Sequence, residues 1–407
     1  MATASLYLPR LRKDQYEIAT HPAKVKVLAM GRRWGKTVMS GVIAMTAASM
    51  GGRVAWVVPN YRNGRPLWRW AEATAAPLRK HGVTINKTER VIEFPNGGGL
   101  GVYSADSEDS IRGEAFHLVI IDEAAKVPQS AYTDVIQPTL ADYDGDLILI
   151  SSPYGKNWFF HEYVAAESDG VRMKAWTAPT SDNPNPNIKR AFELAEFRVP
   201  KRTYRAEWLA EFVEDGGEVF RNVRNCATAV KQDAPIDGHV YLIAVDLGKV
   251  NDFTVLTVFD MTLKAVVFID RFNQIDYTVQ LKRLKVLYER YNASFTIIER
   301  NTGEMFIEQA RRMGLSVRDF HTTSQSKPKL IDDLSVAFEQ GAIAILPARA
   351  MEAAAVTISE LEAYALEKTA SNNIRYNAPP GAHDDTVMSL ALAWYGASIP
   401  IPRAEIW

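Results

Sequence analysis

The chain has 407 residues, of which 47% are hydrophobic and 23% charged. These proportions are typical of globular proteins and exclude a globally disordered or collagen-like chain. At roughly 150 residues per domain, the length predicts two or three domains rather than one small binding module. The 47 Lys and Arg residues nearly balance 48 Asp and Glu residues, for a net charge of −1. This balance excludes a protein that coats nucleic acid through bulk positive charge but permits a local basic groove.

The single cysteine and the lack of long apolar runs narrow the cellular setting. One cysteine, Cys226, can form neither an intramolecular disulfide nor a cysteine-based metal site. No uninterrupted apolar run reaches the roughly 18 residues that a membrane helix needs, and the N-terminal MATASLYLPRLRKDQ lacks the apolar centre of a signal peptide. We therefore expect a soluble intracellular protein with no membrane partner.

Short apolar runs alternate with loops and helix-like stretches in the first half of the chain. The runs are VKVLAM (25–30), RVAWVVP (53–59), GLGVYSA (99–105), HLVII (117–121) and LILIS (147–151). Continuous apolar runs suit strands of a parallel sheet that is covered by helices on both faces. We therefore predict an open α/β sheet, in which ligands bind at the carboxyl ends of the strands.

The first run leads into GRRWGKT, residues 31–37, and then into a helix-like segment. A P-loop needs glycines so that backbone N–H groups can surround phosphates, a lysine for the β- and γ-phosphates, and a hydroxyl for Mg²⁺. Gly31, Gly35, Lys36 and Thr37 supply these groups, although the usual first glycine would fall at Met30. The loop is completed by Arg32, Arg33 and Trp34. An ordinary glycine-containing turn is the alternative, so a second motif must decide.

That second motif is Asp122-Glu123, which directly follows the fourth apolar run. Two acids at a strand end can have separate roles. One carboxylate binds in the coordination shell of Mg²⁺, and the other polarises the attacking water. We predict Asp122 in the first role and Glu123 as the catalytic base. A solvated acidic pair is the alternative for these residues alone, but together with Lys36 and Thr37 they predict hydrolysis of a nucleoside triphosphate.

Three further positions near these motifs are candidates for nucleotide contacts. Gln15 could read an adenine edge, and an exposed residue at a helix start is an equally good interpretation. Arg112 could reach the γ-phosphate of a neighbour in a ring, with a surface charge as the alternative. Ser151-Ser152, after the fifth run, could sense the γ-phosphate or could simply end the strand.

The segment after Thr180 separates the two halves. TSDNPNPN is turn-forming, the stretch that follows it is amphipathic, and VEDGG ends it. We predict an ATPase domain over 1–180, a helical lid or linker over 181–225, and a second domain over 226–407.

Acidic residues end separate elements of the second half. Asp246 follows one apolar run, Glu299 ends FTIIE, and Asp384 and Asp385 open an apolar helix. Their order and spacing resemble an RNase H-type nuclease, in which carboxylates from separate elements hold two divalent metals. We predict all four acids as metal ligands, with Asp246, Glu299 and Asp385 at the catalytic centre, and Asp252 as either a further ligand or a positioning residue. Each acid alone could be a helix cap or a solvated strand end.

Taken in order, the motifs resemble the large terminase subunit of tailed double-stranded DNA bacteriophages. They are GRRWGKT, IRGEAFHLVIIDEA, LILISSPYG, TSDNP, IAVDLGKVNDFTVL, IIERNTGEMF and GAHDDTVMSLALA, which span roughly residues 15–395. The resemblance implies an ASCE-type P-loop ATPase with a parallel sheet, which uses ATP and Mg²⁺, followed by a mixed α/β RNase H-like nuclease with two Mg²⁺ or Mn²⁺ ions. It also implies that Arg32 or Arg33 acts on the γ-phosphate in cis and that Arg112 acts in trans.

The resemblance further implies partners and a place of action. The partners are double-stranded DNA, the portal protein, the small terminase subunit and further copies of the chain, usually in a pentameric ring. The place is the portal vertex of the procapsid in the host bacterial cytoplasm, not the mature virion. Two alternatives are an ATP-binding assembly protein with a degenerate nuclease-like domain and a helicase-like repair enzyme fused to a nuclease. Intact acids oppose the first, and the lack of a second set of helicase motifs after Ser152 opposes the other.

Overall fold

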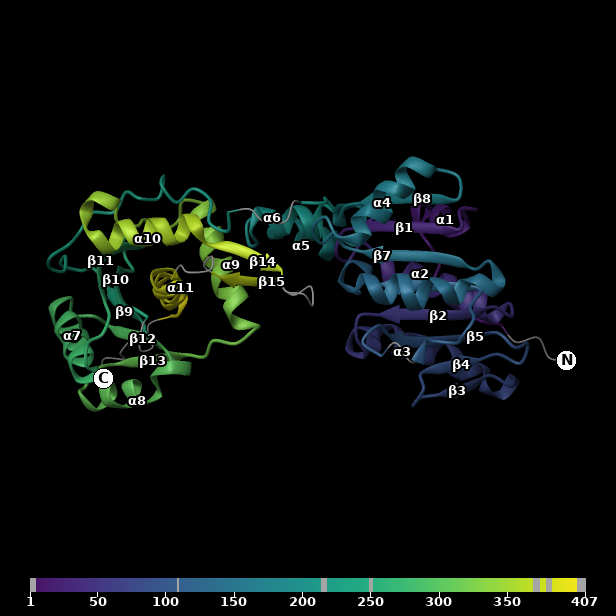
Figure 1. Cartoon of the computed structure of the whole chain (residues 1–407), viewed down its shortest axis with the longest axis horizontal. Helices are drawn as coiled ribbons and strands as arrows, with labels where there is room; N and C mark the ends of the chain where they lie inside the picture. The colour runs from purple at the N-terminus through teal and green to yellow at the C-terminus, as the bar shows by residue number, and fades with distance from the viewer. Residues whose placement is uncertain are drawn as a thin grey trace. The chain divides into compact units, whose positions relative to one another are not determined.

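The computed structural model describes residues 5–107, 110–213, 218–248, 252–368, 374–377 and 383–400. The chain divides into two compact units (Figure 1). Unit 1 comprises Met1–Glu196 and Lys201–Asp215, and unit 2 comprises Phe197–Pro200 and Gly216–Trp407. The linker expected over 181–225 is thus shared between them. Its last part belongs to unit 2 because Phe220 and Val223 are buried in that unit's hydrophobic core.

Unit 1 is built on a sheet of eight strands in the order β3-β4-β5-β2-β6-β7-β1-β8. The strands are β1 (Val25–Met30), β2 (Arg53–Val58), β3 (Thr84–Asn86), β4 (Val91–Glu93), β5 (Gly99–Ser104), β6 (Leu118–Asp122), β7 (Asp146–Ser151) and β8 (Met173–Ala178). Neighbours from β5 to β8 are parallel, whereas β3 and β4 pair antiparallel at one edge. The predicted parallel α/β sheet is therefore confirmed.

Helices cover both faces of this sheet. Leu28 and Met30 of β1 pack in the cluster that contains residues of α1 (Lys13–Thr20), α2 (Lys36–Ser49) and α3 (Tyr61–Ala75). Val27 and Ala29 pack instead with residues of α4 (Trp158–Asp169). The short helices are η1 (Ala76–His81), η3 (Ala124–Lys126), η4 (Ala131–Ile136), η5 (Gln137–Tyr143) and η6 (Thr180–Asp182). Because successive side chains of a strand point to opposite faces, β1 contributes to two cores.

The amphipathic stretch after η6 forms separate helices rather than one. They are α5 (Pro186–Ala195), α6 (Lys201–Thr203) and η7 (Tyr204–Trp208). Pro200 stands just before α6, and proline lacks the N–H group that a continuous helix would need.

Unit 2 contains a five-stranded mixed sheet in the order β11-β10-β9-β12-β13. The strands are β9 (Tyr241–Asp246), β10 (Thr254–Asp260), β11 (Ala265–Phe272), β12 (Phe295–Glu299) and β13 (Val317–Phe320), with a separate pair β14 (Ala365–Lys368) and β15 (Ile374–Asn377). The first three are antiparallel neighbours, and β12 and β13 run parallel to β9. The helices are α7 (Tyr277–Arg290), α8 (Arg300–Arg312), α9 (Ser326–Glu339), η8 (Ala348–Ala350), α10 (Glu352–Ala363) and α11 (Asp385–Ser398).

Helix α11 crosses the sheet of unit 2 with most of its residues buried. The hydroxyl of Ser389 donates to the carbonyls of Ala244 in β9 and Val255 in β10, at 3.2 and 3.3 Å. The N-terminus of α11 is thereby held beside the end of β9, where Asp246 lies.

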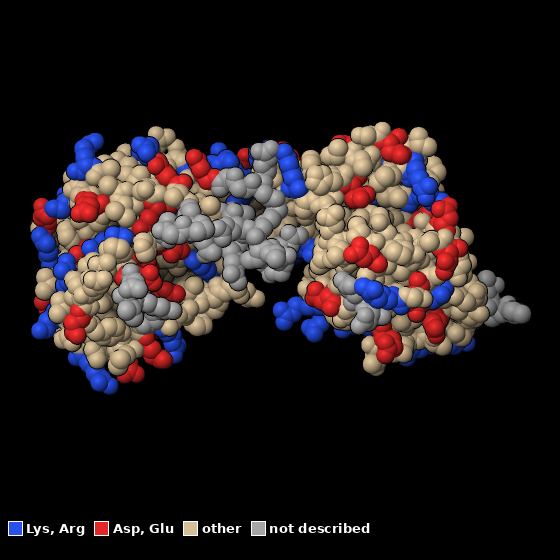
Figure 2. Space-filling model, viewed as in Figure 1, with Lys and Arg blue, Asp and Glu red and all other residues tan. Residues whose placement is uncertain are grey.

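The surface agrees with the balanced composition. On the face drawn in Figure 2, basic and acidic side chains are interspersed over each unit. Among the residues that the structure describes, no helix is both long enough and apolar enough to cross a membrane.

Candidate nucleotide and metal sites

The first site lies at the carboxyl ends of β1, β6 and β7, which are adjacent parallel strands. The P-loop follows β1, Asp122 ends β6 and Ser151 ends β7. A cavity of about 480 Å³ opens there. It is lined by Arg32, Arg33, Gly35, Lys36, Thr37, Val38, Glu123, Lys126, Ser152, Asn183, Ile188 and Glu207. The structure therefore brings together the P-loop and the acidic strand end, which are far apart in sequence.

Lys36 is held at the base of this cavity. Its Nζ donates to the carbonyls of Met30 and Gly31, at 2.9 and 3.2 Å, and to Oγ of Ser152 at 3.3 Å. Burial lowers the pKa of the ammonium, and the carboxylates of Glu123 and Asp122 oppose that shift. The contact with Ser152 places the segment after β7 beside Lys36.

Both glycines of the loop occupy positions where a side chain does not fit. Gly35 has a φ of 114° and is the N-cap of α2. A β-carbon on Gly31 would lie 2.5 Å from the backbone nitrogen of Thr180. Gly31 is thus needed for close approach of the segment after β8, which accounts for the unusual glycine spacing.

The two acids after β6 differ in environment. Asp122 is buried, and this burial, together with repulsion from Glu123, raises its pKa to about 7 despite the attraction of Lys36. Burial also acts to raise the pKa of Glu123, but the positive charges of Lys126, Lys36 and Arg32 together outweigh it and the pKa is lowered. Glu123 has a φ of 55°, an uncommon conformation that aims its side chain into the cavity.

Sequence reasoning missed Lys126, whose Nζ lies 3.0 Å from Oε2 of Glu123. The backbone of this turn is fixed from α4: the amide of Asn157 donates to the carbonyl of Ala125 at 2.7 Å, and the indole of Trp158 donates to that of Val127 at 2.8 Å. A lysine three residues after the acid was the available signal, because one 3₁₀ turn brings residues i and i+3 together.

Gln15, Trp34 and Arg112 are predicted nucleotide residues that do not line the cavity. Gln15 is buried, and its amide donates to the carbonyl of Gly35 at 3.4 Å. The Trp34 ring is only 1% exposed and supports the loop from the core. Arg112 is exposed in the loop before β6 and does not line the cavity. The adenine contact of Gln15 and the trans role of Arg112 stay predictions.

The second site gathers the predicted nuclease acids in unit 2. Asp246 ends β9, Glu299 ends the adjacent parallel strand β12, and Asp385 is the first residue of α11. Burial raises the pKa of Asp246 well above its usual value, and Glu299, Asp385 and Asp384 add to the shift by repulsion. Burial likewise raises the pKa of Asp385, although the Phe253 N–H donates to its Oδ2 at 3.2 Å. Divalent cations would relieve this mutual repulsion, so the donor set fits them.

Asp384 and Asp252, the other two predicted acids, have contacts that differ from one another. Asp384 accepts from Lys327 Nζ at 3.1 Å and from the Tyr364 hydroxyl at 3.4 Å, and Asp252 is exposed and lies 3.8 Å from the His383 ring. Within the described ranges, no three acidic, histidine or cysteine side chains already enclose a common point.

Comparison with known proteins gives consistent matches. Residues 28–224 match the sequence model of a family described as the terminase large subunit, T4likevirus-type, N-terminal. The large terminase subunit of Thermus virus P23-45 is 28% identical over 93% of this chain and 86% of that protein. That of Escherichia phage T5 is 26% identical over 51% of this chain and 49% of that protein. A solved large terminase from a thermophilic bacteriophage is 16% identical, with a TM-score of 0.59 over 95% of this chain and 98% of that chain.

Fold and sites together define a class of protein: a P-loop NTPase unit joined to an RNase H-like unit with an acidic centre. Within that class, the chain is similar to the large terminase subunits of bacteriophages.

Proposed function

We infer that the chain is the motor subunit of viral genome packaging, an enzyme with an ATPase in unit 1 and a nuclease in unit 2. The observation that carries this inference is the convergence of Lys36, Thr37 and Glu123 on one cavity, in a chain that also gathers Asp246, Glu299 and Asp385. A degenerate assembly protein would not be expected to keep both sets of groups.

In the ATPase, we assign roles to residues that line the cavity and to two that do not, Asp122 at the end of β6 and Arg112 in the loop before it. Lys36 and the N–H groups at the start of α2 bind the phosphates, and the Thr37 hydroxyl and Asp122 hold the Mg²⁺ that neutralises phosphate charge. Glu123 orients and deprotonates the attacking water. Arg32 and Arg33 line the cavity and stabilise charge on the γ-phosphate in cis, while Arg112 serves a neighbouring subunit.

In the nuclease, we assign Asp246, Glu299, Asp384 and Asp385 as ligands of two Mg²⁺ or Mn²⁺ ions. Such ions activate water and stabilise the leaving oxygen during cleavage of a phosphodiester. The burial of Asp246 and Asp385 keeps their carboxylates in place, and Asp252 lies near enough to the α11 N-terminus to serve as a further ligand.

The partners follow from the proposed role. We propose that double-stranded DNA is bound through its phosphates without base readout, because base contacts would impede translocation. Arg62, Arg65 and Arg69 are exposed along α3 and are available for such contacts. We further propose that copies of the chain form a ring, pentameric as the family resemblance implies. This ring docks on the portal protein of the procapsid in the host cytoplasm, with the small terminase subunit as recruiter.

One experiment tests both halves of the function. Purified protein is assayed for ATP hydrolysis with Mg²⁺ and for cleavage of linear duplex DNA with Mg²⁺ or Mn²⁺. Lys36→Ala should remove only the first activity and Asp246→Ala only the second. A variant that keeps the activity it is expected to lose would contradict the corresponding assignment.

A further inference from the structure

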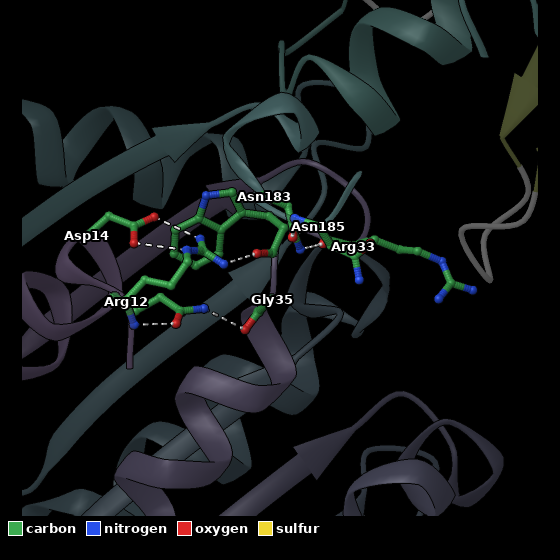
Figure 3. Close-up of polar contacts among 8 residues, drawn as sticks. Arg12, Asp14, Arg33, Gly35, Asn183 and Asn185 are labelled. Atoms are coloured by element: carbon green, nitrogen blue, oxygen red, sulfur yellow. Dashed lines mark hydrogen bonds and ion pairs between the residues drawn. The ribbon is translucent and has the colours of Figure 1, made fainter. Parts of the chain in front are cut away.

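The carbonyl groups of the P-loop from Met30 to Gly35 are all engaged by side chains. Lys36 Nζ donates to the carbonyls of Met30 and Gly31. The next four carbonyls accept from donors outside the loop. Thr180 Oγ1 donates to Arg32 at 2.7 Å, Asn183 Nδ2 to Arg33 at 2.7 Å, Arg12 Nη1 to Trp34 at 2.9 Å, and Gln15 Nε2 to Gly35 at 3.4 Å. Figure 3 shows the last three of these contacts.

The four outside donors come from two separate parts of unit 1. Arg12 and Gln15 belong to the start of α1, and Thr180 and Asn183 belong to the segment between β8 and α5. The loop is therefore held from both sides by chain segments that are about 20 and 150 residues away in sequence. Such long-range contacts do not arise from the local folding of a strand-loop-helix unit.

Two of the donors, Arg12 and Asn183, are themselves oriented by further contacts. The Arg12 guanidinium donates to both carboxylate oxygens of Asp14, at 3.1 and 2.8 Å, and lies 4.7 Å over the Trp34 ring. Asn183 Oδ1 accepts from the Asn185 N–H at 2.9 Å, which turns its NH₂ group toward Arg33. The orientation of these two donors is thus fixed by contacts other than those with the loop carbonyls.

The contact from Asn183 falls where the backbone most needs support. Arg33 has a φ of 61°, a left-handed conformation that residues with a β-carbon adopt rarely. Thr180 is fully buried, and its hydroxyl donates to the carbonyl of Arg32, the residue just before Arg33. It therefore adds to this support.

In a trans peptide the carbonyl of one residue and the N–H of the next point in opposite directions. Outward carbonyls at Arg32, Trp34 and Gly35 therefore turn the N–H groups of Arg33, Gly35 and Lys36 to the other side. The Trp34 N–H donates instead to the Gly31 carbonyl at 3.2 Å, so the successive free pair is Gly35 and Lys36. Successive N–H groups that face one way form an anion-binding concavity.

We propose that Thr180 and Asn183, with Arg12 and Gln15, are positioning residues that pre-form this concavity for the phosphates of a nucleoside triphosphate. The proposal rests on the ATPase function proposed for unit 1. It assigns Gln15 to the loop backbone rather than to the adenine edge, so its contribution is the same for every base.

The test compares Thr180→Val, which removes the hydroxyl but keeps the shape, with Thr180→Ser, which keeps the hydroxyl. Asn183→Ala and Gln15→Ala test two further donors, and Asn187→Ala, in the first turn of α5, is the matched control. KM and kcat are measured with MgATP and MgGTP. Loss of one hydrogen bond should raise KM about fivefold for both nucleotides in Thr180→Val, Asn183→Ala and Gln15→Ala, with kcat little changed. Thr180→Ser and Asn187→Ala should behave as wild type.

Unchanged KM in Thr180→Val and Asn183→Ala would overturn the proposal, as would a loss confined to kcat. If Gln15→Ala raised the KM for ATP but not for GTP, Gln15 would contact the adenine base, and its assignment to the loop backbone would be wrong. Binding of a fluorescent ATP analogue separates this proposal from the proposed function. If the wild-type chain binds the analogue without hydrolysing ATP, the proposed function fails. The positioning role is still tested: weaker binding of the analogue by the variants supports it, and binding equal to wild type contradicts it.

Discussion

Lys126 Nζ lies 3.0 Å from Oε2 of Glu123, so the carboxylate assigned to activate water is paired with a lysine one turn further along the chain. Both residues line the same cavity as Lys36. The backbone that carries this lysine is fixed by Asn157 and Trp158. Lys126 can thus steady the carboxylate without itself shifting the turn.

Lys126→Met should lower kcat for ATP hydrolysis on the order of tenfold, because a less well oriented Glu123 accepts the proton of the attacking water less efficiently. Lys126→Arg, which can keep the ion pair, should retain most of the rate. Lys189→Met, on the exposed face of α5, is the control. Steady-state kinetics check the expectation, and a Lys126→Met enzyme with wild-type kcat would show that the pair does not orient the base.

Asp122 gives a prediction on stability and pH. Its pKa is raised to about 7 from an ordinary value of 3.8, chiefly by burial. Between those values the folded state binds more protons than the unfolded state, so the free energy of unfolding should fall as pH rises. Asp122→Asn cannot ionise and should therefore have a higher Tm than wild type at pH 8 in EDTA, by at least about 3 °C, with a smaller difference at pH 5.

Differential scanning calorimetry at the two pH values measures this effect, with the exposed Asp142→Asn as the control. Equal Tm values for Asp122→Asn and wild type at pH 8 would show that ionised Asp122 carries no penalty in the folded protein.

The nuclease acids give a prediction on metal binding that does not depend on DNA cleavage. Repulsion among Asp246, Glu299 and Asp385 destabilises the site, and a bound cation stabilises the folded state by mass action. Mg²⁺ or Mn²⁺ should raise the Tm of the wild-type transition that reports unit 2. Asp246→Asn should abolish both this shift and DNA cleavage while ATP hydrolysis persists. A metal-dependent shift of wild-type size in Asp246→Asn would remove Asp246 from the ligand set.

The sequence predicted the elements whose side chains are buried on both faces. The runs at β1, β2, β5, β6 and β7 are almost wholly buried, so their apolar character is continuous. Strand β8 was missed because its residues are mostly half-buried and its MKAWTA sequence has no apolar run. Strands β3 and β4 have three residues each, too few for a pattern to show.

The same distinction applies to the candidate sites. Asp122 and Asp246 could be predicted because each ends a recognisable strand, and Lys36 because it stands in a glycine-containing loop that follows one. Asn183 could not be placed at the P-loop, since only the three-dimensional fold brings it to Arg33. Nor could the burial of Gln15 and Trp34 be predicted, because the partners that cover them belong to other elements.

Arg112 gives a prediction about assembly. It is exposed outside the cavity of its own subunit, so a role in hydrolysis requires a neighbour. Arg112→Ala should reduce the ATPase rate of the assembled protein but not the basal rate of dilute protein. An arginine finger supplied in trans can contribute about 10³-fold or more to kcat, as an order of magnitude from other NTPases.

Mixing inactive variants tests this arrangement directly. Lys36→Ala cannot hydrolyse ATP but keeps Arg112, whereas Arg112→Ala keeps an intact cavity. In mixed assemblies an Arg112→Ala subunit should regain activity when its neighbour is Lys36→Ala, because that neighbour supplies the missing guanidinium. The ATPase rate should therefore rise above that of either variant alone and pass through a maximum at intermediate mixing ratios. A rate that never exceeds the weighted mean of the two variants would show that Arg112 acts within its own subunit or only supports its loop.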